Sequence, residues 1–151
     1  MDKAELARQN FRSGCNCAQS VLCAFENECG LDHGTALKLA SGFGAGMARM
    51  REVCGAVSGM FMAADLIFGP SDPNDKAAKD AHYAELQKLA AEFRKETGSI
   101  ICRVMLGLEK SGPDNPVSEA RTEAYYRKRP CSELCALAAG ILENYLKNEI
   151  H

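Results

Sequence analysis

The stretch CGAVSGMFMAADLIF, residues 54–68, decides the fold. Wound as a helix, it is apolar on nearly every side, and its one charged residue is Asp65. A helix that is apolar all round normally lies buried in the middle of a domain. Gly55 and Gly59 are one helical turn apart, which lets a second helix approach closely. We therefore predict an all-α fold, an irregular helical bundle with Cys54–Phe68 as its buried central helix.

The remaining periodic segments also have helical spacing, and none alternates as a strand would. Gly30 is suited to ending a helix and Asp32 to capping the next, while Gly98 ends a long amphipathic helix. The glycine-rich segment 41–46 is predicted to be non-helical. We find no domain boundary, so residues 1–151 are predicted to form a single cysteine-rich helical domain. Besides 54–68, helices are expected at about residues 2–12, 17–29, 32–40, 75–96, 99–106, 117–128 and from 130 onward.

Composition excludes several classes of function. The 151 residues carry a net charge of −2 and no tryptophan, which argues against a nucleic-acid partner and against a base-stacking surface. No apolar run is long enough to span a membrane, so membrane insertion is not expected. The polar N-terminus, Met1–Leu6, lacks the apolar core of a signal peptide. We therefore expect a cytoplasmic protein.

Eight cysteines are the unusual feature of the sequence. In a reducing cytosol, surplus thiols more often indicate a metal, a cluster or catalysis than disulfides. Four of them fall at or near predicted helix N-termini: Cys17, Cys54, Cys102 and Cys131. Unpaired backbone N–H groups and the helix dipole stabilise an anion there, which lowers the pKa of a thiol. We expect these four cysteines to lie near one another.

The other four cysteines have weaker interpretations. Cys15 lies two residues before Cys17, and Cys135 lies one turn after Cys131, so both are candidate auxiliary thiols or metal ligands. Cys23 and Cys29 are interpreted as packing residues. The sequence has no C-x-x-C pair, and the spacings miss the common ferredoxin and zinc-finger patterns. Any metal site would therefore combine distant parts of the chain.

Five pieces of the sequence carry a family resemblance: Asn16–Gln19, Ser41–Gly44, Cys54–Gly59, Gly98–Arg103 and Arg129–Cys131. With these pieces in this order, the chain resembles the redox-active proteins named for the cysteine pattern C_GCAxxG_C_C. The resemblance implies that the family's four characteristic cysteines are the four at the predicted helix starts. It also implies a redox role, since some relatives carry selenocysteine at one such position. A related domain accompanies the haem region of split-Soret cytochromes, where an iron–sulfur centre has been suggested.

The favoured mechanism is electron transfer through an iron–sulfur centre, or another metal centre, held by the four thiolates. Four cysteines match the ligand count of a [2Fe–2S] or [4Fe–4S] cluster. Glycines nearby would let the backbone approach a cluster and donate N–H bonds to sulfur, with close packing as the equally weighted alternative. These glycines are Gly42, Gly44, Gly46 and the cofactor-binding candidate Gly55.

Two other mechanisms are kept open. In a metal-free thiol–disulfide or peroxide mechanism, Cys54 would attack as a thiolate, and Cys17, Cys102 or Cys131 would resolve the intermediate. This reaction would make the protein an oxidoreductase. In a structural or trafficking module, the thiolates would bind zinc or copper without redox chemistry of their own. The expected partner is a redox protein, and a homodimer is left open.

A few further residues are weaker candidates. His82 and His33 are considered as ligands or bases, but His82 lies on an apolar stripe typical of a core residue, and His33 is expected to be exposed near a helix start. Arg49 and Arg51 precede Cys54 and are interpreted as a solvated loop, with anion binding or a lowered Cys54 pKa as the alternative. Asp65 needs a partner if it is buried.

Overall fold

The structure is a computed structural model that describes residues 1–108 and 112–149. Within these ranges it is all-helical apart from one isolated antiparallel bridge between Val53 and Ile101, which confirms the predicted fold class. None of the described helices combines the length and the apolar character that crossing a membrane requires. The helices are α1 (Lys3–Arg12), α2 (Cys17–Ala24), α3 (Glu26–Cys29), α4 (His33–Leu39), α5 (Gly44–Met47), α6 (Gly55–Phe68), α7 (Lys76–Thr97), α8 (Cys102–Met105), α9 (Glu123–Lys128) and α10 (Cys131–Glu149).

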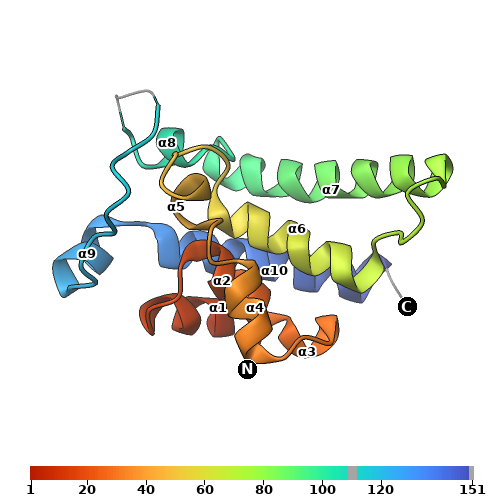
Figure 1. The fold of residues 1–151 in the computed structure, drawn as a ribbon, viewed down its shortest axis with the longest axis horizontal. Coiled ribbons are helices and arrows are strands. Elements are labelled where there is room, and N and C mark those ends of the chain that lie inside the picture. Colours follow the sequence, from red (N-terminus) through yellow and green to blue (C-terminus); the bar gives the residue numbers. More distant parts are fainter. Residues whose placement is uncertain (109–111, 150–151) are drawn as a thin grey trace.

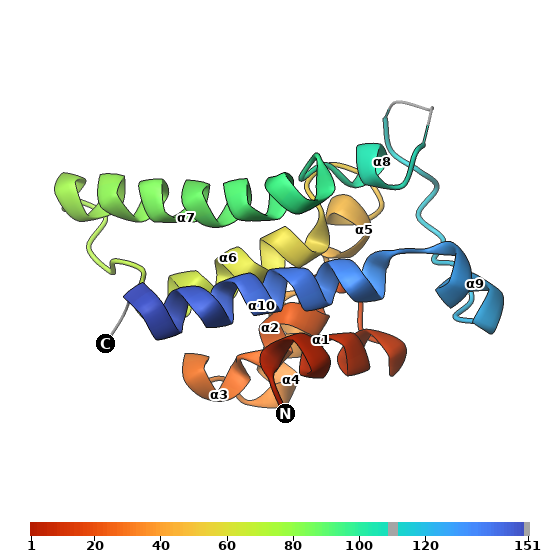
Figure 2. The same ribbon diagram turned by 180° about the vertical axis from the view of Figure 1, so that it is seen from behind.

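The helices form three tiers. The long helix α7 runs along one side, α6 and α10 occupy the middle, and α1 to α4 lie on the other side (Figure 1). The view from behind shows the same order, with α5, α8 and α9 gathered at one end of the molecule (Figure 2). The most extensive helix contacts are those of α1 with α10 and of α2 with α6. The irregular end, where the short helices gather, is the end that carries the candidate site.

Helix α6 is the central buried helix that the sequence predicts. Its small residues allow α2 to come close, because a Cβ atom added to Gly59 would lie only 2.5 Å from the carbonyl oxygen of Ala18. Met60 and Val57 are fully buried. The close approach of α2 and α6 brings together the two helices that begin at Cys17 and immediately after Cys54.

The charged residue of α6 has a partner on α7. Asp65 Oδ1 lies 2.6 Å from Nε2 of His82, whose ring also packs edge-on against Phe68. The His82 side chain is buried, and its Nδ1 has no hydrogen-bond partner among the described residues. The pair therefore links α7 to α6, and the Asp65 side chain, which is 56% exposed, faces solvent at the edge of the otherwise apolar helix.

Several helix boundaries differ from those predicted. The expected helix 17–29 is interrupted at Phe25, whose backbone leaves the helical conformation and joins α2 to α3. Residues 117–122 are not helical, because tertiary contacts hold Glu119 and Arg121 in an extended segment that ends at the N-cap Thr122. The predicted end signals Gly30 and Gly98 are confirmed, since both are left-handed helix C-caps.

Candidate functional site, a cavity lined by cysteines

A short antiparallel bridge places Cys54 and Cys102 close together. The backbone N–H of Cys54 donates to the Ile100 carbonyl over 2.7 Å, and the N–H of Cys102 donates to the Glu52 carbonyl over 2.6 Å. Cys54 is the N-cap residue of α6, and Cys102 is the first residue of α8. Two helices that start far apart in the sequence thus begin side by side.

Cys17 and Cys131 form the second pair, at the starts of α2 and α10. Asn16 fixes the start of α2 through a capping box, in which its side chain accepts from the Gln19 N–H and the Gln19 side chain accepts from the Asn16 N–H. The thiols of Cys17 and Cys131 lie close enough to shift each other's pKa. The predicted placement of four cysteines at helix N-termini is therefore confirmed for both pairs.

All four cysteines line a single cavity of about 330 Å³ at the irregular end of the molecule. Its apolar wall consists mainly of Phe11, Met105, Leu106, Tyr125 and Leu134. Its charged wall consists of Arg49, Arg51, Glu119, Arg121 and Arg129. The cavity therefore combines soft sulfur donors with an excess of positive charge.

The thiols in this cavity are not activated by their helix N-termini, contrary to the expectation from the sequence. Burial raises the pKa of Cys54 to about 12, although the N–H groups of Ala56 and Val57 act in the opposite direction. Burial likewise raises the pKa of Cys102, partly offset by Arg51. Loss of hydration thus outweighs the helix N-terminus. Burial removes water from a full negative charge, whereas the helix dipole offers only about half a positive charge in return.

The Cys17 and Cys131 thiols also have raised pKa values. For Cys131 the main cause is the interaction of its thiol with the Cys17 thiol, followed by burial. For Cys17 the interaction with the Cys131 thiol favours the thiolate, but the interaction with the Cys135 thiol and burial outweigh it. At neutral pH the unliganded cavity therefore holds four protonated thiols.

Arg51 is a buried part of the site, so the prediction of a solvated loop is wrong for this residue. It is 5% exposed, its Nη1 lies 3.7 Å from the Cys102 sulfur, and its Nη2 lies 3.2 Å from Asp114. Arg49 is also fixed, since its Nε donates to the Asn115 carbonyl over 2.6 Å. The positive charge of Arg51 therefore acts directly on Cys102.

Two further arginines at the cavity were not anticipated. Arg121 donates to the carbonyls of Phe11 and Cys15, and its guanidinium lies 4.3 Å from the centroid of the Phe11 ring. Arg129, two residues before Cys131, forms an ion pair with Glu119. Arg121 lies in no recognisable motif, and Arg129, although it belongs to the Arg129–Cys131 piece, was assigned no role from the sequence, because the contacts of both depend on the path of the segment before α9.

The segment before α6 has an unusual backbone that closes one wall of the cavity. Ala45, Met47, Ala48, Arg49 and Arg51 all have left-handed φ values, between 53° and 73°. Each such residue costs about 1–2 kcal/mol relative to the right-handed conformation. The segment is kept in this shape by its contacts with the segment around Cys102.

The glycines near the cysteines permit close packing. A Cβ atom at Gly46 would lie 2.6 Å from Cβ of Cys102, and one at Gly55 would lie 2.9 Å from Cβ of Cys17. Gly44 is pressed against Asn16 in the same way, whereas Gly42 faces open space. Gly44, Gly46 and Gly55 line the cavity, and Gly42 does not.

The other four cysteines lie outside the cavity wall, and all eight are free thiols. Cys135 is fully buried beside the site and its sulfur donates to the Cys17 carbonyl over 3.7 Å. Cys29 is half-buried, with its sulfur 3.7 Å from the Ala63 carbonyl. Burial raises the pKa of Cys23 to about 12, and the negative charge of a Cys15 thiolate contributes in the same direction.

The four cavity sulfurs are more widely spaced than the ligands of a single metal ion. Within residues 1–108 and 112–149, the group of His, Cys, Asp or Glu side chains whose ligand atoms all lie within 4.8 Å of one another is Cys23, Glu26 and His33. A tetrahedral zinc site with Zn–S bonds of about 2.3 Å places its sulfurs about 3.8 Å apart. Among the described residues, no three of the cavity sulfurs all lie within 4.8 Å of one another.

Comparison with known proteins gives one match. The family model described as "Putative redox-active protein (C_GCAxxG_C_C)" covers residues 15–145, which include all four cavity cysteines. The chain matches no curated protein and no solved structure.

Proposed function

Because the chain belongs to the C_GCAxxG_C_C family of redox-active proteins, we propose that it transfers electrons through an iron–sulfur centre held in the cavity by Cys17, Cys54, Cys102 and Cys131. The observation that carries the proposal is that four cysteines from four separate helix starts line one cavity of about 330 Å³. Four thiolates are the ligand set that binds [2Fe–2S] and [4Fe–4S] clusters. Such a centre would supply one-electron chemistry to a redox partner.

The donor set and the space of the cavity fit this group. The four sulfurs are spread too far for one tetrahedral ion, whereas the irons of a cluster are distributed over a larger volume. Close packing at Gly46 and Gly55 places the glycine backbone against the Cβ atoms of Cys102 and Cys17. The apolar side chains of the cavity wall limit the access of water to the sulfurs.

The charged residues of the cavity favour a negatively charged occupant. Four thiolates carry four negative charges, which an apolar cavity alone would strongly disfavour. Arg51 stabilises the thiolate form of Cys102 directly, and Arg129 acts in the same direction on Cys131. The arginines thereby reduce the cost of removing four protons when a centre binds.

A second candidate function is metal-free thiol–disulfide exchange. The observation that favours it is the proximity of the Cys17 and Cys131 thiols, which shift each other's pKa and are therefore the best candidates for disulfide partners. Oxidation would join their sulfurs and release two protons and two electrons to an oxidising substrate. The raised pKa of Cys54 argues against the version in which Cys54 attacks first.

The deciding experiment measures iron, zinc, copper and acid-labile sulfide per chain after anaerobic purification. We expect iron with matching sulfide, and we expect single substitutions to serine at the four cavity cysteines to remove both. Cys29→Ser is the matched control, because Cys29 is half-buried but lies outside the cavity, and it should retain the centre.

Two outcomes would contradict the iron–sulfur proposal. Protein free of metal that forms a reversible Cys17–Cys131 disulfide would identify the dithiol mechanism instead. Stoichiometric zinc or copper without sulfide, lost in the cavity variants and retained in Cys29→Ser, would identify a metal-binding module.

A further inference from the structure

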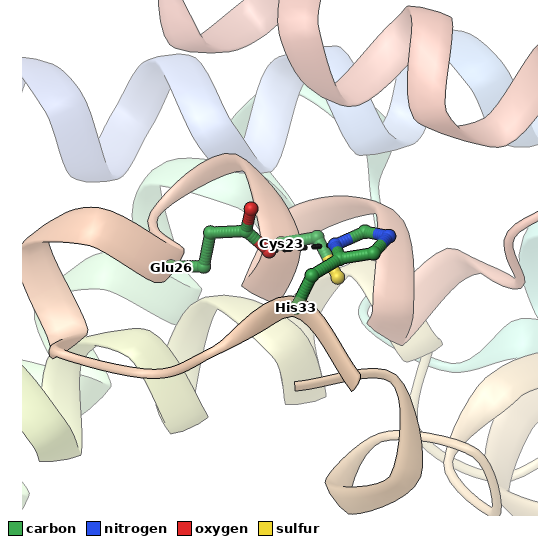
Figure 3. Close-up of side chains that lie close together, drawn as sticks. All are labelled: Cys23, Glu26 and His33. Atoms are coloured by element: carbon green, nitrogen blue, oxygen red, sulfur yellow. Dashed lines mark hydrogen bonds and ion pairs between the residues drawn. The ribbon is translucent and has the colours of Figure 1, made fainter. Parts of the chain in front are cut away.

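A second group of metal-ligating side chains lies outside the cavity, on α2, α3 and α4. Figure 3 shows the side chains of Cys23, Glu26 and His33 converging from three separate elements. Their sulfur, oxygen and nitrogen ligand atoms all lie within 4.8 Å of one another. None of the three residues lines the cysteine cavity.

The local fold brings these three residues together. Cys23 lies in the last turn of α2, Glu26 is the first residue of α3, and His33 is the first residue of α4. The left-handed Gly30 ends α3 and reverses the chain, and Asp32 caps α4, so that His33 returns to the start of α3. His33 Nδ1 lies 2.8 Å from Glu26 Oε2.

We propose that Cys23, Glu26 and His33 form a zinc-binding site separate from the cysteine cavity. A thiolate, a carboxylate and an imidazole are all established ligands of Zn²⁺, and three protein ligands leave the fourth tetrahedral position for water. The charges also match, because one thiolate and one carboxylate neutralise a divalent ion while the imidazole stays neutral. A monovalent ion such as Cu(I) would leave the site with a net negative charge.

The exposure of the three side chains is consistent with a site that is loaded from solvent. The Cys23 residue is 5% exposed, whereas the His33 side chain is 60% exposed. The ring nitrogen of His33 that does not face Glu26 points away from the other two ligands (Figure 3). Ligation through Nδ1 would therefore leave Nε2 as a proton donor to water. A bound ion would tie α2, α3 and α4 together.

Histidine NMR gives a direct readout of this site. The chain has three histidines, His33, His82 and His151, so selective labelling resolves each imidazole. Titration of Zn²⁺ into reduced, metal-free protein should shift the His33 resonances and saturate at one equivalent. Cys23→Ser should abolish this shift. Cys29→Ser is the matched control and should preserve it, since Cys29 lies on α3 and points to the Ala63 carbonyl.

The proposal is overturned if the His33 resonances do not move with zinc, or if they move equally in folded Cys23→Ser protein. Should Cys23→Ser not fold, His33→Gln provides the second measurement, because an exposed side chain is replaced without loss of the core. Wild-type protein should bind one more equivalent of Co²⁺ than His33→Gln, and zinc should raise Tm in the wild type by more than in the variant. Equal cobalt binding would refute the site. Because the cavity cysteines are unchanged throughout, the result is independent of the proposed iron–sulfur function.

Discussion

In the reduced, metal-free protein, the alkylation rate of Cys54 is predicted to keep rising with pH well beyond the pH at which the rate of an ordinary thiol levels off. Burial raises the pKa of Cys54 to about 12, compared with about 8.5 for an unperturbed cysteine. At about pH 8 an unperturbed thiol is roughly one-quarter ionised, whereas Cys54 is ionised to about one part in ten thousand, a difference of roughly 2,000-fold. The pKa of Cys54 is raised and not lowered because burial favours the neutral thiol over the charged thiolate.

The assay is iodoacetamide labelling between about pH 7 and pH 11, with the modified Cys54 peptide quantified by mass spectrometry. The rate should rise about tenfold for each pH unit without levelling, because the thiolate is the nucleophile. Burial slows the reagent at every pH, but it does not determine where the profile levels. The same chain unfolded in urea is the control, and its profile should level near about pH 8.5. A plateau below about pH 9 in folded protein would refute the assignment of a protonated, unactivated Cys54.

Three other predictions concern the packing and charge of the site. Gly59→Ala should destabilise the protein by about 1–2 kcal/mol in urea unfolding, because the added Cβ would lie 2.5 Å from the Ala18 carbonyl oxygen of α2. Gly140→Ala in α10 is the control. Its Cβ makes only an ordinary contact, so it should stabilise the protein by up to about 1 kcal/mol. Gly46→Ala should cost about 1–3 kcal/mol by the same measurement, since its Cβ would lie 2.6 Å from Cβ of Cys102; an unchanged midpoint would contradict this packing. Arg51→Met should raise the pKa of Cys102 further and slow its alkylation at a fixed pH, while Arg51→Lys should retain part of the wild-type rate.

Local signals in the sequence are sufficient to place most helices and the four cysteines within them. Asn16, Asp32 and Gly98 act as the caps that their residue types predict, because capping depends on neighbours within a few positions. The apolar segment of α6 likewise predicts its own burial. The functional roles of the four cysteines remain predictions.

The electrostatics of the site depend on tertiary structure and were not predictable from local patterns. The sign of the Cys54 pKa shift follows from burial by distant segments, which outweighs the helix N-terminus that the sequence does reveal. The contacts of Arg51 with Cys102 and Asp114 span 51 and 63 residues along the chain. Arg121 reaches carbonyls more than 100 residues away, and no spacing rule connects such pairs.

The distribution of the four cavity cysteines along the chain determines when the site can exist during protein synthesis. A nascent chain folds from its N-terminus as it emerges, and Cys17 is available early, whereas Cys131 is the first residue of α10, the last helix. Helix α1, the first to appear, makes its most extensive contacts with that last helix. A centre that used all four thiols would therefore be complete only once Cys131, at the start of α10, had been synthesised.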